Sequence, residues 1–240
     1  MRCYASRPAE ELGVLSFGFG GLMKRLVARA LIVVTSILGI VFAQVPPASA
    51  QASDELASNL GALWTRVLER PGPANPAAGH GAPCWELGHN TVAPFTFATQ
   101  EPSCTVGAHT KLFVAGFTTE CSTFDSDCDG DTDFGNCDAT SADGLLDCAR
   151  LRDSNKNPTV RVDGGDPVNL TEVETPPLNI HLPNHNIFDE LGIPTPGGKG
   201  VSVAHGFVAL LGPLEPGTHT IAFTGNFPTG TTTIIVKPGH

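Results

Sequence analysis

The chain has 240 residues, of which 24 are acidic and 14 basic, for a formal net charge of −10. This balance argues against nucleic acid and anionic membrane surfaces as partners, because both are bound through a basic surface. A hydrophobic fraction of 41% is enough for one well-buried domain.

The first 50 residues are predicted to be a leader rather than part of the fold. Met23 begins a basic stretch, which the apolar run at residues 30–43 follows. That run is shorter than the roughly 20 residues that span a bilayer. A small-residue site ends at Ala50 and predicts a signal peptide at residues 23–50. We therefore expect translation to start at Met23 rather than Met1, cleavage after Ala50, and a secreted product without membrane insertion.

Residues 51–71 are predicted to form one amphipathic helix, with Ser53 as its N-cap and Pro71 as its stop. The apolar residues that share one stripe at helical spacing are Leu56, Leu60, Leu63, Trp64, Val67 and Leu68. Residues 72–84 are rich in Pro, Gly and Ala, which predicts a loop after the helix.

Residues 72–240 are predicted to form a single β-rich domain. Short β-branched and aromatic runs alternate with Gly, Pro and Asn, and they place strands at residues 95–99, 104–106, 112–117, 159–162, 179–182, 200–211, 219–224 and 231–236. A turn dipeptide within residues 160–170 predicts a hairpin. Many short strands with few helices favour an all-β fold, an antiparallel β-sandwich or jelly roll.

One further helix is predicted at residues 141–152, after the acidic segment. Ser141 is its expected N-cap, and Leu145, Leu146, Ala149 and Leu151 are expected on one side.

The acidity is concentrated in one segment. Without the leader the chain has 22 acidic and nine basic residues, and eight of the acids are Asp residues between positions 125 and 147. The string DSDCDGDTDFGNC at residues 125–137 has Asp at every second position and a Gly at the sixth, as in an EF-hand-like or extracellular-repeat-like calcium loop. The predicted Ca²⁺ ligands are Asp125, Asp127, Asp129, Asp131, Asp133 and Asn136.

We expect the calcium site to be weak, and the segment has two alternative interpretations. Asn136 stands where an EF-hand loop has a bidentate Glu, so we expect a structural site with an affinity on the order of 10⁻⁴ to 10⁻³ M. A solvent-exposed acidic insertion is the first alternative, since long surface insertions cost little. Zinc is the second, but this segment offers Asp where zinc prefers clustered Cys and His.

Several fragments resemble a family of secreted bacterial β-rich proteins of unknown function. The fragments are LWTRVLERPGPANP, CTVGAHTKLFV, ECST, LPNHNIFDELGIP and PLEPGTHTIAFTGNFPTG. In that family a Trp-rich helix precedes a β-rich domain, so the resemblance implies this fold, export and two disulfides, and it implies no activity. The Asp-rich part of residues 121–148 departs from the family pattern and is interpreted as an insert.

Six cysteines remain after the leader, an even set that predicts a disulfide framework in an oxidising compartment. Six cysteines allow fifteen pairings. Their order and context favour Cys84–Cys104, Cys121–Cys148 and Cys128–Cys137. The second bond would close the base of the insert, and the third would shape its tip.

The common catalytic motifs are absent from the sequence: it has no nucleophile elbow, His-Glu-x-x-His, phosphate-binding loop or dinucleotide fingerprint. Paired carboxylates for glycoside hydrolysis would have to come from Glu86, Glu172, Glu174, Asp189 and Glu190, among which the sequence selects no pair.

The histidines and tryptophans offer two further candidate sites, one for a metal ion and one for a carbohydrate. A metal site from His181, His185 and either His205 or His219 is the alternative to isolated histidines at strand ends. Trp64 is expected in the core, whereas Trp85 is the one hint of a carbohydrate-binding surface.

The sequence therefore favours a secreted binding or structural module without enzymatic activity. Its expected partner is a carbohydrate or another component of the cell envelope. The alternative is a secreted hydrolase that acts on an extracellular polymer through acidic or His residues.

Overall fold

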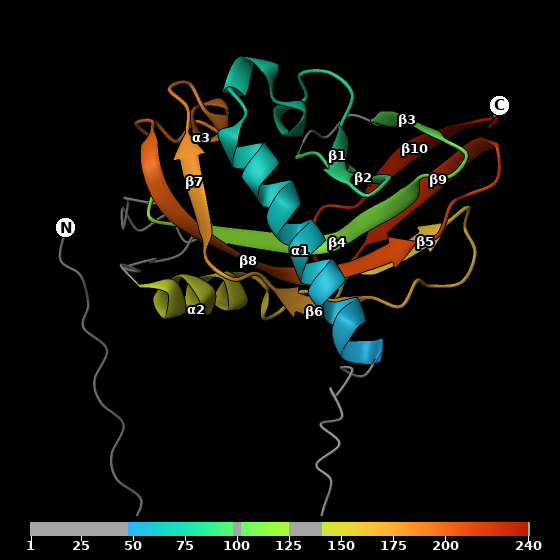
Figure 1. Ribbon diagram of the computed structural model, residues 1–240, viewed down its shortest axis with the longest axis horizontal. Helices are drawn as coiled ribbons and strands as arrows, with labels where there is room; N and C mark the ends of the chain where they lie inside the picture. Colours follow the sequence, from blue (N-terminus) through green and yellow to red (C-terminus); the bar gives the residue numbers. More distant parts are fainter. Residues whose placement is uncertain (1–47, 98–101, 125–140, 240) are drawn as a thin grey trace, which may run out of the picture. The chain divides into compact units, whose positions relative to one another are not determined.

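The computed structural model describes residues 48–97, 102–124 and 141–239 (Figure 1). Its helices are α1 (Ala48–Glu69), α2 (Ala142–Asp153) and α3 (Ile187–Glu190), with two 3₁₀ turns, η1 (Gly72–Ala74) and η2 (Pro76–Ala78). Its strands are β1 (Cys84–Gly88), β2 (Thr91–Pro94), β3 (Ser103–Gly107), β4 (Lys111–Ser122), β5 (Thr159–Val162), β6 (Thr171–Glu174), β7 (Leu178–Leu182), β8 (Gly198–Leu211), β9 (Gly217–Thr224) and β10 (Gly230–Lys237).

The strands form two sheets. The larger has the order β1-β2-β4-β8-β6, with β7 also paired to β8, and the smaller has the order β3-β10-β9-β5. The long antiparallel β4–β8 ladder runs from Leu112 opposite Leu211 to Ser122 opposite Ser202. β2–β4 and β3–β10 are parallel pairs. The prediction of a β-rich domain is confirmed, but both sheets are mixed rather than purely antiparallel, and the jelly roll remains a prediction.

Helix α1 covers one face of the larger sheet, lying across β4 and β8 (Figure 1). All six residues of the predicted stripe are buried, which confirms the amphipathic helix. Fully burying one such side chain contributes about 1.5–3 kcal/mol. The predicted N-cap is wrong, because α1 begins at Ala48 and Ser53 lies inside it. The residues before Ser53 are mostly Ala, the best helix former, so the helix extends through them.

The apolar side chains form three buried clusters. The first lies between α1 and the larger sheet and includes Phe113 and Val208. The second joins β4 of the larger sheet to the smaller sheet, through Val114 and Ile234 among others. The third lies under α2, around Leu145. The larger sheet is therefore covered on both faces.

Most predicted strands are confirmed, and β5 has the predicted bounds. The strand predicted at residues 95–99 is wrong: the chain forms β2 at Thr91–Pro94 instead, paired with β1 across a turn. His89 and Asn90 both have positive φ in that turn. The hairpin at residues 160–170 is confirmed only in part, since its second arm makes a single bridge, Arg161 opposite Pro167.

Helix α2 confirms the second helix prediction. Ser141 is its N-cap, with the side-chain oxygen accepting a bond from the Gly144 N–H at 3.2 Å. Leu145 and Ala149 are buried, as predicted. Leu151 is 72% exposed, so its assignment to the buried side is wrong. It follows Leu145 by six residues, which on a helix turns it well away from that face.

Two of the predicted disulfides are present. Cys84–Cys104 joins β1 to β3 and so connects the two sheets, while Cys121–Cys148 joins β4 to α2. Such bonds indicate a compartment outside the reducing cytosol. The third predicted pair, Cys128–Cys137, lies outside the described residues. In the described part of the chain, no helix is long and apolar enough to cross a membrane.

Candidate binding cleft

The described residues enclose a cleft of about 670 Å³ between the two sheets. Four parts of the chain line it: the connection between β2 and β3, the middle of β4, the end of β9, and the β9–β10 turn with the start of β10. A volume of this size is in the range of pockets that hold small organic ligands.

Phenylalanine rings supply the apolar walls of the cleft. The lining rings are Phe95, Phe97, Phe117, Phe223 and Phe227. Phe95 and Phe97 meet edge to face with their centroids 5.1 Å apart, and Phe117 and Phe227 lie 4.9 Å apart. Phe97 is 41% exposed, so its ring is available to a ligand.

Threonines supply the polar part of the lining. They are Thr96, Thr118, Thr224, Thr229, Thr231 and Thr232. None of the described lining residues carries an ionisable side chain. The hydroxyls of Thr96 and Thr118 already donate to the carbonyls of Ala77 and His205. Thr224, Thr229 and Thr231 are exposed, and a Thr hydroxyl can both donate and accept a hydrogen bond, so the cleft combines neutral hydrogen-bonding groups with flat apolar rings.

A bulge in β4 shapes the floor of the cleft. The register against β8 shifts between Ala115 and Phe117, which leaves Gly116 unpaired. A Cβ at residue 116 would lie 2.6 Å from Leu170 Cδ1, so the Leu170 side chain would have to move to admit a larger residue. Bulges bend a strand and redirect its side chains, and this one lies where β4 changes from the core to the cleft.

Two tryptophans support the segment of residues 95–97, which we call the Phe95–Phe97 wall of the cleft. Trp64 of α1 packs on Phe95 and Phe97, and its indole N–H donates to Thr118 Oγ1 at 3.0 Å. The indole N–H of Trp85 donates to the Phe95 carbonyl at 2.8 Å. Trp64 is core, as expected. Trp85 is only 4% exposed, so the interpretation of its ring as a carbohydrate-binding surface is wrong.

The 3₁₀ turn η2 anchors the same wall. The Phe97 N–H donates to the Ala77 carbonyl at 2.8 Å, and the Thr96 hydroxyl donates to that carbonyl at 3.2 Å. The wall is therefore fixed by backbone bonds as well as by ring packing.

A buried histidine lies on β8, outside the cleft lining. His205 Nδ1 is 2.6 Å from Asp153 Oδ2 at the end of α2, and its Nε2 is 3.4 Å from Glu172 Oε1 on β6. His205 and Asp153 are both almost fully buried, whereas the Glu172 side chain is 61% exposed. This cluster joins α2 to the sheet, and the Arg150–Glu174 ion pair also joins α2 to β6.

The histidines singled out for a metal site do not converge. His181 is on β7, His185 has a φ of 55° just before α3, and His219 pairs with Asp163. Among the described residues, no group of three or more His, Cys, Asp or Glu side chains is arranged to hold a metal ion.

The five candidate carboxylates lie on three elements, β1, β6 and α3. Glu190 contacts His80, and Asp189 completes the capping box of α3. Glu86 lies on β1 and is exposed. Glu172 and Glu174 both lie on β6, where Glu172 contacts His205 and Glu174 pairs with Arg150. The predicted Ca²⁺ ligands, Asp125 to Asn136, lie outside the described residues, and that site remains a prediction.

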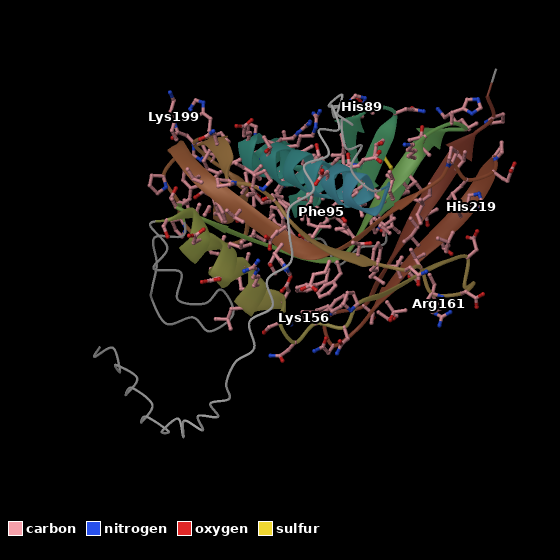
Figure 2. The ribbon with its side chains drawn as sticks, turned by 60° about the horizontal axis from the view of Figure 1, so that its bottom comes forward. His89, Phe95, Lys156, Arg161, Lys199 and His219 are labelled. Carbon is pink, nitrogen blue, oxygen red and sulfur yellow. A yellow bond between two sulfur atoms is a disulfide. The ribbon has the colours of Figure 1, made fainter. Side chains whose placement is uncertain are left out.

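An exposed ion pair connects β9 with the turn after β5. His219 Nδ1 is 2.7 Å from Asp163 Oδ2, and His219 Nε2 is 2.8 Å from the Glu215 carbonyl (Figure 2). The hydrogen bond to Asp163, with help from the Glu215 carbonyl, raises the pKa of His219 above its ordinary 6.5. The same bond, with the Thr220 N–H, lowers the pKa of Asp163 below 3.8.

Sequence reasoning did not find the lining phenylalanines. The chain has 13 Phe residues, and nothing in the spacing of these five distinguishes them from the others. A partial signal was the FTF string at residues 95–97, which places two rings on the same side of an extended segment.

The comparisons with known proteins leave the family open. No protein-family model matches the chain, and no curated protein matches it. Among solved structures, the solution structure of amebosin aligns at 12% identity over 61% of this chain and 96% of that chain, with a TM-score of 0.21. A similarity at that level carries no argument about fold or function.

Proposed function

We propose that this protein is an exported, non-enzymatic glycan-binding module and that the cleft between its sheets is the binding site. The observation that carries the proposal is the lining itself, five Phe rings and six Thr side chains with no ionisable group among the described lining residues. A sugar ring has apolar C–H faces and a rim of hydroxyls, so it is complementary to flat rings that alternate with neutral hydrogen-bonding groups.

Export is supported by two features. The predicted signal peptide at residues 23–50 would direct the chain out of the cytosol. The two disulfides are of the kind that persists in an oxidising compartment. Both favour an extracellular or cell-envelope glycan as the ligand.

A hydrolase is the second candidate, and the His205 cluster is the observation that favours it. A buried His–Asp pair is a common acid–base arrangement. Here, however, both imidazole nitrogens of His205 face carboxylates, and in the described residues no side-chain hydroxyl or thiol contacts the ring. The cluster therefore fits a role in docking α2 better than a role in nucleophilic attack.

Retention on insoluble glycans separates these candidates. The mature chain, Phe97→Ala and Leu191→Ala would be incubated with cellulose, chitin, peptidoglycan and plant cell-wall polysaccharide. Leu191 is the matched control, because it is an apolar residue of nearly the same exposure, 42%, that does not line the cleft. Loss of one ligand-contacting ring should weaken binding about tenfold, which corresponds to about 1.4 kcal/mol.

The expected result is retention of the wild type and Leu191→Ala, weaker retention of Phe97→Ala, and no release of soluble sugar. Equal retention of all three chains would contradict the assignment of the cleft. Release of soluble product that disappears in His205→Ala would favour the hydrolase instead.

A further inference from the structure

A lysine lies next to the cleft without contributing to its lining. Lys156 belongs to the loop between α2 and β5, and its Nζ is 5.3 Å from the centroid of the Phe117 ring (Figure 2). Phe117 is one of the lining rings and packs on Phe227. The ammonium group therefore lies within side-chain reach of a ligand that covers Phe117.

The loop that carries this lysine is tied to the cleft wall. The Lys156 N–H donates to the Asp153 carbonyl at 2.8 Å, which continues the end of α2. The Asn157 N–H donates to Asn226 Oδ1 at 3.1 Å, and Asn226 Nδ2 donates to the Asn155 carbonyl. Asn226 directly precedes Phe227, so the cation and the ring pair are held by one hydrogen-bonded unit.

Lys156 makes no ion pair with any residue that the structure describes, so its charge is available to a ligand. Arg150 of α2 pairs with Glu174, and Lys111 at the start of β4 pairs with Glu55. The nearest carboxylate in sequence, Asp153, is engaged with His205. A cation over an aromatic face is held by a weak electrostatic attraction, and it can still form a hydrogen bond with an anion.

We infer that the glycan bound in the cleft is acidic, with the carboxylate of a hexuronate residue at Lys156. This inference rests on the proposed function and names the class of its ligand. The rings and threonines take the faces and hydroxyls of the sugars, and Lys156 supplies a positive charge that matches a carboxylate.

The test uses two ligands with the same sugar backbone, trigalacturonate and its fully methyl-esterified form, in which each carboxylate is replaced by an uncharged methyl ester. Binding to the mature chain would be measured by calorimetry for the wild type, Lys156→Met and Lys156→Arg. Met keeps most of the apolar stem over Phe117 and removes the charge, whereas Arg keeps the charge. We expect the wild type to bind the acid about tenfold more tightly than the ester, Lys156→Met to bind both equally, and Lys156→Arg to restore the preference.

The outcomes separate this inference from the proposed function. If the ester binds the wild type as tightly as the acid does, and Phe97→Ala weakens both, the cleft binds glycan but the role of Lys156 is wrong. If Lys156→Met weakens acid and ester by the same factor, the lysine acts only through packing, and the inference is again wrong. Failure of both ligands to bind overturns this inference, whereas the proposed function stands or falls on retention of the other glycans.

Discussion

The Cys84–Cys104 disulfide should control both the stability of the domain and the geometry of the cleft. It is a covalent crosslink between the two sheets, and it flanks the segment that carries Phe95 and Phe97. Cys104 is fully buried in the cluster between the sheets. Replacing both cysteines by Ala removes the crosslink and leaves the hydrogen bonds of β1 and β3 intact.

The expected cost follows from the loop that the bond closes. The two cysteines are 20 residues apart, which in the chain-entropy relation corresponds to about 3.3 kcal/mol at about 25 °C. Cys121–Cys148 closes a loop with a separation of 27 residues and should contribute about 3.6 kcal/mol. The two double variants should therefore lose nearly the same free energy of unfolding in urea.

The variants should differ at the cleft. Both tryptophans of the chain contact the Phe95–Phe97 wall and are at most 5% exposed. Acrylamide quenching of their fluorescence therefore measures how well that wall excludes solvent. Quenching should increase in Cys84→Ala/Cys104→Ala and stay at the wild-type level in Cys121→Ala/Cys148→Ala. A loss of stability below about 1 kcal/mol in both variants would refute the entropy argument. Equal quenching in both would refute the link between the first bond and the cleft.

Two further predictions concern the rest of the domain. Asn75→Ala should lower the free energy of unfolding in urea by about 2–4 kcal/mol. The buried Asn75 amide donates to the Val67 carbonyl at 2.8 Å and accepts from the Ala77 N–H at 3.0 Å, and both groups would lose their partner. Asn75→Asp should recover only part of this loss. The pKa of His219 is raised in the folded protein, so the contribution of His219 to stability is fully present below pH 6.5 and is lost as the pH rises through the pKa of the folded state. The pKa of Asp163 is lowered, so the contribution of Asp163 is lost as the pH falls through a folded-state pKa below 3.8. The urea midpoint of His219→Ala should therefore lie below that of the wild type between these limits and converge with it at alkaline pH; a difference that persists unchanged there would mean that the ring acts through packing alone.

The sequence predicted best the parts of the fold in which one face is apolar. The stripe of α1 was readable because the helix buries it against a sheet, which selects apolar residues at helical spacing. Strand β5 was readable from its β-branched residues. Strand β6 was missed because it has one buried side chain, Val173, among exposed polar ones. Strands β1 and β2 were missed because their turn, His89–Asn90, takes a positive φ without the Gly that usually indicates one.

The cleft could not be predicted from the sequence, for a different reason. Its rings come from residues 95–97, 117, 223 and 227, and only the arrangement of the two sheets brings these segments together. The same limit applied to the charged groups. His205 and Asp153 are 52 residues apart in the chain. The five candidate carboxylates come from β1, β6 and α3, and the sequence does not show which side chains they meet.

The most direct test of the proposed binding site is the chemical shift of threonine methyl groups in the mature chain, recorded while the glycan oligomer that is retained best is added. We predict that perturbations concentrate on the lining threonines, such as Thr96, Thr118 and Thr231, and spare buried threonines elsewhere, such as Thr110 and Thr195. Perturbations centred on Thr110 or Thr195, with the lining threonines unchanged, would contradict the proposal that the phenylalanine-lined cleft is where this protein binds its ligand.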